Sequence, residues 1–199
     1  MKYAIIGSGK IGTALARAFA RQNIEVAIAN SRGPETISSL KNELGPSIVP
    51  LSVRDACEAD TIFLAVPFSA HTDVARELQQ WNGKIIVDTT NTFHIAPEDS
   101  GVLLSSEIVS KAFGGARLVK AFNHLPAAQL GTNPALAGQR QAIFVSSNDP
   151  DASSAVAAIT SDLGFAPVEL GRLDEGGVPL HVVDGQPGGL LFQNLAKLG

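Results

Sequence analysis

The sequence has little of several things, and each shortage excludes a class of protein. It has one cysteine, Cys57, in 199 residues, so no disulfide can form within the chain and a site of four thiolates is impossible. Its 15 basic residues are outnumbered by 19 acidic ones, which disfavours a dedicated nucleic-acid binder. Charged residues make up only 17% and hydrophobic ones 45%, and this balance excludes intrinsic disorder.

Long apolar runs are missing as well. Stretches such as residues 62–66 and 85–87 are far shorter than the roughly 18 residues that a membrane-spanning helix needs. The apolar stretch at the N-terminus is too short for the core of a signal peptide. We therefore expect a cytoplasmic chain that does not associate with a membrane, and its length favours one domain.

Short apolar runs alternate with amphipathic segments along the whole chain. We expect strands at residues 2–7, 24–29, 47–50, 61–66, 84–88, 117–121, 141–146 and 165–170. Helices are expected at residues 10–21, 35–44, 53–59, 71–80, 151–163 and 190–198. This alternation predicts an α/β fold with a doubly wound, mostly parallel sheet of the Rossmann type and helices on both faces.

The first strand runs into a glycine-rich turn that opens a helix. Residues 7–12 read Gly-Ser-Gly-Lys-Ile-Gly. In this pattern Gly7 permits the tight turn, Gly9 lets the backbone approach a pyrophosphate, and Gly12 lets the helix pack close to the sheet. The free N–H groups at the start of the helix favour an anion. We therefore expect a dinucleotide site and assign to it Gly7, Ser8, Gly9, Lys10, Ile11 and Gly12.

The second strand indicates which dinucleotide binds. A site that prefers NAD carries Asp or Glu about 20 residues after the turn, on the ribose 2′-hydroxyl. This strand instead ends in Asn30-Ser31-Arg32-Gly33-Pro34, with a hydroxyl and a guanidinium where a carboxylate would repel a phosphate. We therefore predict NADP(H), with Ser31 and Arg32 on the 2′-phosphate and Asn30 either supporting the turn or touching the ribose.

Ligands of such sheets bind beyond the carboxyl ends of the strands, so the later strand ends complete the predicted cofactor site. We assign to it the residues at two of these ends: Ala65, Val66, Pro67, Phe68, Thr89 and Asn91. Phe68 either flanks the nicotinamide or is a core aromatic. Thr89 and Asn91 either meet the carboxamide or the substrate, or belong to a turn-forming polar cluster.

Asn123 and His124 follow the strand at residues 117–121 and are the candidates for an acceptor site. His124 could bind the substrate or act as an acid, and neither residue is assigned a catalytic step. The glycine-rich residues 171–189 exceed the roughly 12–15 residues of an ordinary loop, so we expect part of them to line the same pocket. The histidines lack the spacing of a metal site, and no metal is expected.

With these residues in place, the chain resembles the NADPH-dependent reductases related to the coenzyme F420-dependent NADP oxidoreductases. It is also similar to the oxidoreductase domain of the metalloreductases. The matching pieces are residues 7–12, 30–34, 65–68, 119–128 and 170–177. The resemblance implies hydride transfer between NADP(H) and a deazaflavin (F420) or flavin-like acceptor, with the protein holding the two rings face to face.

Two other hypotheses about the function stay open. One is an NADPH-dependent imine or carbonyl reductase related to the pyrroline-5-carboxylate reductases, which would need its own proton donor. The other is a non-catalytic NADPH-binding protein, because a fold does not fix a function. We expect a single domain over residues 1–199, with a dinucleotide-binding core over 1–122 and a C-terminal extension over 123–199 that lines the acceptor site. The partner is a small-molecule redox acceptor, and both a monomer and a homodimer are left open.

Overall fold

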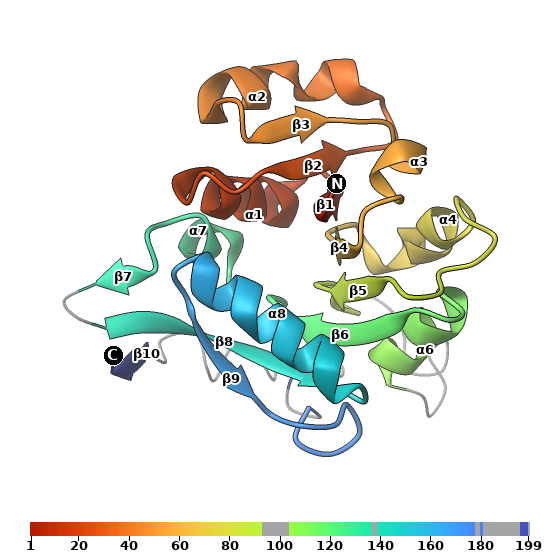
Figure 1. Ribbon diagram of the computed structural model, residues 1–199, viewed down its shortest axis with the longest axis vertical. Helices are drawn as coiled ribbons and strands as arrows, with labels where there is room; N and C mark the ends of the chain where they lie inside the picture. Colours follow the sequence, from red (N-terminus) through yellow and green to blue (C-terminus); the bar gives the residue numbers. More distant parts are fainter. Residues whose placement is uncertain (93–103, 137–138, 178–179, 181–195, 199) are drawn as a thin grey trace.

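The computed structural model describes residues 1–92, 104–136, 139–177, 180 and 196–198 (Figure 1). Its sheet has the strand order β10-β8-β6-β5-β4-β1-β2-β3, and β7 and β9 pair with β8 outside that path. Six strands run parallel: β1 (Tyr3–Ile6), β2 (Val26–Ala29), β3 (Ile48–Pro50), β4 (Thr61–Leu64), β5 (Ile85–Asp88) and β6 (Arg117–Ala121). This order confirms the predicted doubly wound, mostly parallel sheet.

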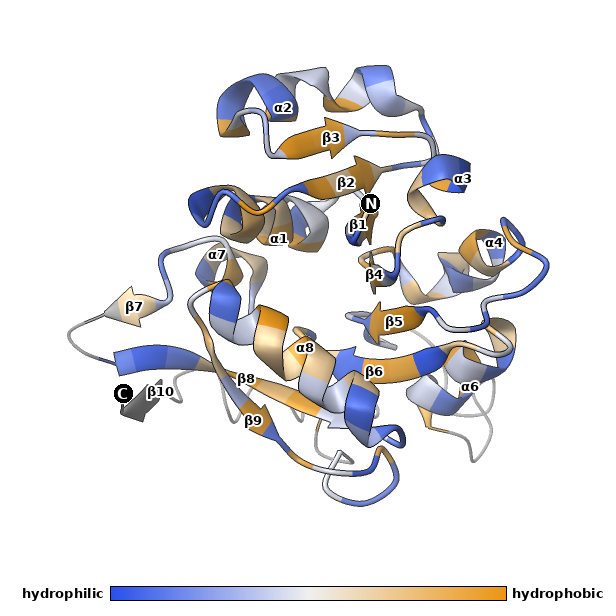
Figure 2. Ribbon diagram, viewed as in Figure 1, coloured by the Kyte–Doolittle hydropathy of each residue, from blue (hydrophilic) through white to orange (hydrophobic). Residues whose placement is uncertain are grey.

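Helices cover both faces of the sheet (Figure 1). The longer ones are α1 (Lys10–Arg21), α2 (Ser38–Leu44), α6 (Ser105–Ala112) and α8 (Pro150–Asp162). The shorter ones are α3 (Val53–Ala56), α4 (His71–Ala75), α7 (Ala127–Leu130) and the 3₁₀ turns η1 (Pro34–Ile37) and η2 (Phe68–Ala70). Strands such as β2 and β3 are among the most hydrophobic segments of the molecule (Figure 2).

The central strands contribute side chains to two separate hydrophobic cores, one on each face of the sheet. Successive side chains of a strand point to opposite faces, so Ile5 packs in the core under α1 and α8 while Ile6 packs in the other. In the first core the rings of Phe19 and Phe63 meet edge to face, with centroids 5.4 Å apart. In the second core Trp81 stacks edge-on against Phe113 at 4.8 Å. Strands buried on both faces explain the continuous apolar runs in the sequence.

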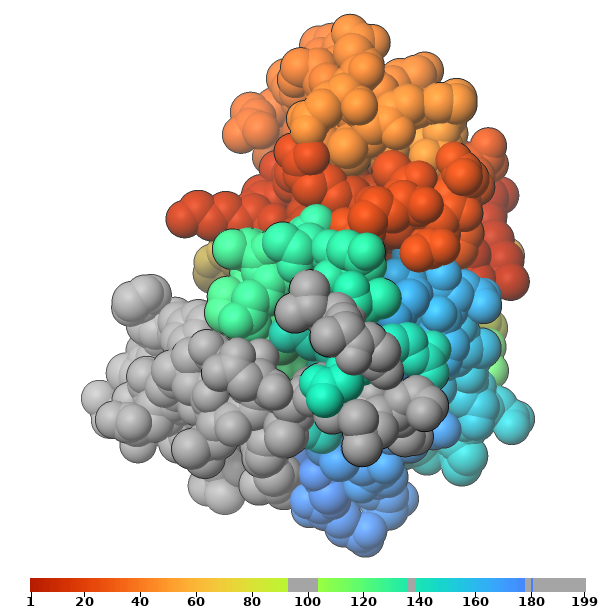
Figure 3. Space-filling view, turned by 90° about the vertical axis from the view of Figure 1, so that its left-hand side faces the viewer, coloured from red at the N-terminus to blue at the C-terminus, as the bar shows by residue number. Residues whose placement is uncertain are grey.

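The C-terminal part extends the sheet at the β6 edge. β8 (Gln139–Ser147) runs antiparallel to β6 and pairs with β9 (Ala166–Glu169) in parallel. β7 (Ala135–Leu136) and β10 (Ala196–Leu198) pair antiparallel with the start of β8. From the side, α7 lies against α1 and α8 follows below (Figure 3), and the Arg21 side chain donates a hydrogen bond to the Gly131 carbonyl at 2.6 Å.

Several element predictions need correction. The helix expected at residues 190–198 is wrong for 196–198, which form β10, because pairing with the β8 edge overrides local helix propensity; residues 190–195 lie outside the described part. β8 runs antiparallel to β6, which a mostly parallel sheet allows. The helix expected to reach residue 80 ends at Ala75, whose carbonyl accepts a hydrogen bond from the Trp81 indole at 3.0 Å. α6 and α7 were not predicted.

Candidate functional site

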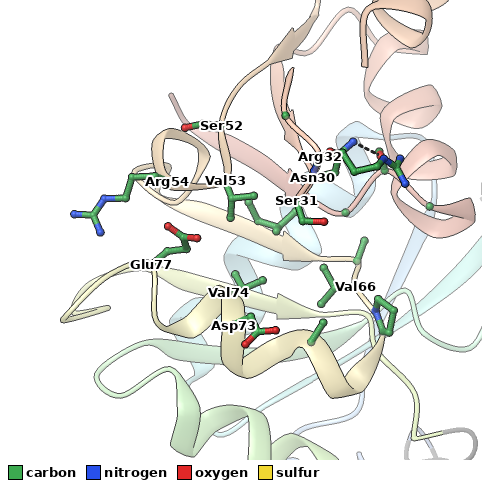
Figure 4. Close-up of a pocket in the computed structure, with 18 residues that line it drawn as sticks. Asn30, Ser31, Arg32, Ser52, Val53, Arg54, Val66, Asp73, Val74 and Glu77 are labelled. Atoms are coloured by element: carbon green, nitrogen blue, oxygen red, sulfur yellow. Dashed lines mark hydrogen bonds between the residues drawn. The ribbon is translucent and has the colours of Figure 1, made fainter. Parts of the chain in front are cut away.

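A cleft of about 700 Å³ opens at the carboxyl ends of β1, β2 and β4 (Figure 4). This is the edge at which open α/β sheets bind ligands. Its lining comes from the glycine-rich turn, the end of β2, the start of α3, the end of β4 and the α4 segment. The residues are Ile6, Gly7, Ser8, Gly9, Asn30, Ser31, Arg32, Gly33, Ser52, Val53, Arg54, Ala65, Val66, Pro67, Ala70, Asp73, Val74 and Glu77.

The three glycines of the turn are required for different steric reasons. Gly7 has φ +112°, and a Cβ there would lie 2.1 Å from the Ala65 carbonyl oxygen. A Cβ on Gly12 would lie 1.8 Å from the Gly7 carbonyl oxygen, so this glycine allows α1 to pack on the turn. A Cβ on Gly9 would meet nothing within 4 Å, which leaves the space above that backbone open to a ligand.

Gly9 is also the N-cap of α1 and makes no side-chain cap. The first N–H groups of α1 are therefore left for an anion, as in other dinucleotide sites. The remaining members of the motif do not line the cleft: the Lys10 side chain is exposed, Ile11 packs partly buried against the core, and Gly12 is buried.

Asn30 braces the turn at the end of β2. Its side-chain amide donates to the Ser8 hydroxyl at 2.7 Å and to the Thr36 hydroxyl at 2.9 Å. Its side-chain oxygen accepts the Arg32 backbone N–H at 2.8 Å. Asn30 therefore ties the second strand to the glycine-rich turn, which is the supporting role among the two that the sequence left open.

Ser31 and Arg32 are exposed and sit at one end of the cleft (Figure 4). Arg32 also lines a smaller hollow of about 270 Å³ beside α1 and α2. That hollow contains the ion pair between Arg17 and Glu43. Within the described residues the Arg32 guanidinium has no carboxylate partner, so its positive charge is available at the end of β2.

The end of β4 lines the cleft only in part. Ala65, Val66 and Pro67 face it. Phe68 is buried and packs against the His71 ring at a centroid distance of 4.9 Å. Phe68 belongs to the core on that face of the sheet, which favours the second of its two predicted roles.

A buried polar network joins the ends of β5 and β6. The Lys120 ammonium donates to the Asp88 carboxylate at 2.9 Å and to the Thr90 carbonyl at 2.6 Å. The other Asp88 oxygen accepts the Thr90 N–H at 2.9 Å and its hydroxyl at 2.7 Å. The Thr89 hydroxyl donates to the Leu64 carbonyl at 2.9 Å. Thr89 is therefore used inside the protein, and neither Thr89 nor Asn91 lines the cleft.

Asn91 and Asn123 form a reciprocal pair at the same edge. The Asn91 amide donates to the Asn123 carbonyl at 2.8 Å, and the Asn123 amide donates to the Asn91 side-chain oxygen at 3.0 Å and to the Leu180 carbonyl at 2.6 Å. Phe122 precedes this pair with φ +61°. That left-handed residue ends the β6 geometry and turns the chain at the edge of the sheet.

His124 is buried, with 4% of its surface exposed. Its Nε2 lies 3.2 Å from the Ala142 carbonyl oxygen, so Nε2 carries the hydrogen and donates. Burial lowers the pKa of His124 to about 4 despite this hydrogen bond, and the imidazole is neutral near pH 7. Within the described residues, its Nδ1 and the Asn123 Oδ1 are buried without a hydrogen-bond partner.

Only part of the predicted pocket loop can be placed. Of residues 171–189 the structure describes 171–177 and Leu180, and the rest lie outside the described residues. The Gly171 carbonyl accepts from the Ser146 hydroxyl at 2.8 Å and from the Ser147 N–H at 3.0 Å. The Leu180 carbonyl reaches Asn123, so at least one residue of this segment contacts an acceptor-site candidate.

The far end of the cleft was not predicted from the sequence. It is formed by Ser52, Val53, Arg54, Asp73, Val74 and Glu77. These residues carry no motif; the one local signal is Ser52, whose hydroxyl accepts the Asp55 N–H at 3.1 Å and caps α3. The described ranges contain no group of three or more side chains that could hold a metal ion. They also contain no helix long and apolar enough to cross a membrane.

Comparison with known proteins adds a family relationship. Residues 2–92 match the family model described as NADP oxidoreductase, coenzyme F420-dependent. The solved structure of the hypothetical protein SMa0349 from Sinorhizobium meliloti is 40% identical, covers 100% of this chain and 96% of that one, and superposes with a TM-score of 0.88.

Two further relatives are more distant. A candidate F420-dependent NADP-reductase from Arthrobacter sp. FB24 is 26% identical, with coverage of 87% of this chain and 86% of that one and a TM-score of 0.71. The mouse (Mus musculus) metalloreductase STEAP2 is 28% identical over 173 residues, which are 85% of this chain. The chain spans about a third of the length of this curated relative, 33%.

Proposed function

We propose that this chain transfers hydride between NADP(H) in the cleft and a deazaflavin or flavin-like acceptor. It belongs to one family with the S. meliloti protein SMa0349, and it is an NADP-dependent oxidoreductase of the F420-dependent NADP reductase-like type. When bound, NADPH supplies the hydride. The residues of the chain bind and orient the two partners.

The cleft is the observation that carries this proposal. It joins the open backbone at Gly9, the free N-terminus of α1, and the exposed Ser31 and Arg32 in one cavity. A pyrophosphate fits the first two groups, and a 2′-phosphate fits a hydroxyl with an unpaired guanidinium. Gly7, Ser8, Asn30, Ala65, Val66 and Pro67 complete the proposed NADP(H) site from among the predicted residues.

The acceptor side supports ring-to-ring transfer over reduction of a carbonyl or an imine. Reduction of those groups needs a proton donor near pH 7. The pKa of His124 is lowered to about 4 by burial, so the His124 imidazole is neutral near pH 7 and does not supply this proton as an imidazolium. Transfer between two redox rings needs positioning instead, and we propose that Asn123 and His124 line the acceptor site.

The test is to follow loss of NADPH absorbance with oxidised F420, FMN, FAD and a panel of small carbonyls and imines. We expect NADPH to be used in preference to NADH, and F420 or a flavin to be reduced. His124→Ala should raise KM for that acceptor more than it lowers kcat. Turnover of a carbonyl or imine alone, with a drop of about 10²–10⁴ in kcat for His124→Ala, would refute the proposal.

A further inference from the structure

At the far end of the cleft, among polar and charged residues, two valines border a space that we call the slot. Val53 at the start of α3 and Val74 in α4 lie on opposite sides of it (Figure 4). Val74 is buried and Val53 half-buried. Arg32, proposed to bind the 2′-phosphate, lies toward the other end of the cleft (Figure 4). A ligand that extends from Arg32 into the slot would place an apolar group between the two valines.

The carboxylate of Glu77 lies at this end of the cleft (Figure 4). Glu77 lies three residues after Val74, at which spacing side chains share one face of a turn, and the residue is half-buried and lines the cleft beside the slot (Figure 4). Within the described residues Glu77 makes no side-chain hydrogen bond or ion pair. The Arg54 side chain extends away from it (Figure 4).

The carboxylate of Asp73, unlike that of Glu77, has an ion-pair partner. Asp73 also lines the cleft, but its side chain is exposed and pairs with Arg76 at 2.9 Å. Asp73 thus has a partner on its own helix face, whereas the Glu77 carboxylate keeps its capacity to accept a hydrogen bond from a ligand in the slot.

A free carboxylate in a cleft for a phosphorylated cofactor must face a part of the ligand that donates hydrogen bonds, because it would repel the phosphates. Resting on the proposed function, we infer that the slot between Val53 and Val74 holds the adenine of NADP(H), and that Glu77 accepts a hydrogen bond from its 6-amino group. Glu77 is then the residue that selects the base.

The hypoxanthine analogue of NADP⁺ tests this role directly, because it carries a carbonyl oxygen in place of the 6-amino group. An oxygen against the carboxylate loses a charged hydrogen bond and adds repulsion, and sites built to pair a polar group reject analogues that lack it. A lost charged hydrogen bond corresponds to a binding difference of roughly tenfold or more.

The experiment measures the dissociation constants of NADP⁺ and of its hypoxanthine analogue by calorimetry. The parent protein should prefer NADP⁺ by about tenfold or more. Glu77→Gln should lose most of this preference, because an amide can donate to the carbonyl. Glu77→Asp should reduce it, because the shorter carboxylate lies farther from the base. Glu58→Gln removes an exposed carboxylate outside the cleft and should keep the parental ratio.

Each other outcome has a definite meaning. Equal binding of both nucleotides by the parent, or an unchanged ratio in Glu77→Gln with a parental unfolding temperature, overturns the assignment of Glu77 and leaves NADP binding intact. Failure of the folded parent to bind either nucleotide overturns the proposed function itself.

Discussion

Acidification should destabilise the protein through His124. Burial lowers the pKa of this imidazole to about 4 in the folded protein, against about 6.5 in an unfolded chain. The unfolded state therefore binds the proton first, and the contribution of His124 to stability is full above about pH 6.5 and is lost as pH falls toward about pH 4. With these two pKa values, the titration of His124 lowers the free energy of unfolding, relative to neutral pH, by about 2 kcal/mol at pH 5 and about 3 kcal/mol at pH 4.

Comparison with a variant isolates this loss from the titration of the carboxylates. His124→Gln keeps a donor for the Ala142 carbonyl but does not titrate. Urea unfolding of both proteins at pH 7, 6 and 5 gives the free energies of unfolding. Between pH 7 and pH 5 the parent should lose about 2 kcal/mol more than the variant. Parallel pH dependences of the two proteins would show that His124 titrates normally, and the argument against an acid role would fall.

Three further substitutions test the cofactor site and the buried pair. Arg32→Ala should weaken NADPH by about 1.5–3 kcal/mol and leave NADH nearly unchanged in fluorescence titrations, whereas equal weakening would contradict the 2′-phosphate assignment. Gly9→Val places a branched side chain in the open space above the turn and should abolish NADPH binding without changing the circular dichroism spectrum; retained tight binding would disprove the phosphate site. Lys120→Met leaves the buried Asp88 carboxylate unpaired and should lower the free energy of unfolding by about 3–5 kcal/mol. The exposed control Lys41→Met should change the free energy of unfolding little. A similarly small effect of Lys120→Met would contradict the hypothesis that Lys120 stabilises the fold by pairing with Asp88.

The parallel half of the sheet could be predicted because its signals are local. The central strands β1, β2, β4 and β5 are largely apolar runs buried along their whole length. The glycine-rich turn fixes where β1 ends and α1 begins. Gly7 and Gly12 could be assigned in detail because only glycine fits where the backbone lies so close. The division into a core and a C-terminal extension stays a prediction, and so do the roles of the individual site residues.

The far end of the cleft could not be predicted for a physical reason. Val53 and Val74 come from different helices. They lie across the cleft from each other only because the strand order brings α3 and α4 to the same edge of the sheet. Neither residue type indicates a ligand by itself, and Glu77 reads in the sequence as an ordinary helix carboxylate. Lys120 did carry a signal, since a lysine inside an apolar strand needs a buried partner, but its partner lies 32 residues away.

The pairing of Asn91 with Asn123 shows how a core residue sets the geometry of a site. The sequence predicts that both asparagines reach the same edge, but the pair forms after Phe122 adopts φ +61°. A left-handed conformation costs a non-glycine residue about 1–2 kcal/mol. The Phe122 ring packs edge to face against Phe63 and Phe165, with ring centroids 5.7 Å and 6.2 Å apart. Such aromatic pairs contribute about 0.5–1.5 kcal/mol each to stability. Ring packing in the core therefore offsets the strain, and it holds the turn that brings Asn123 to Asn91.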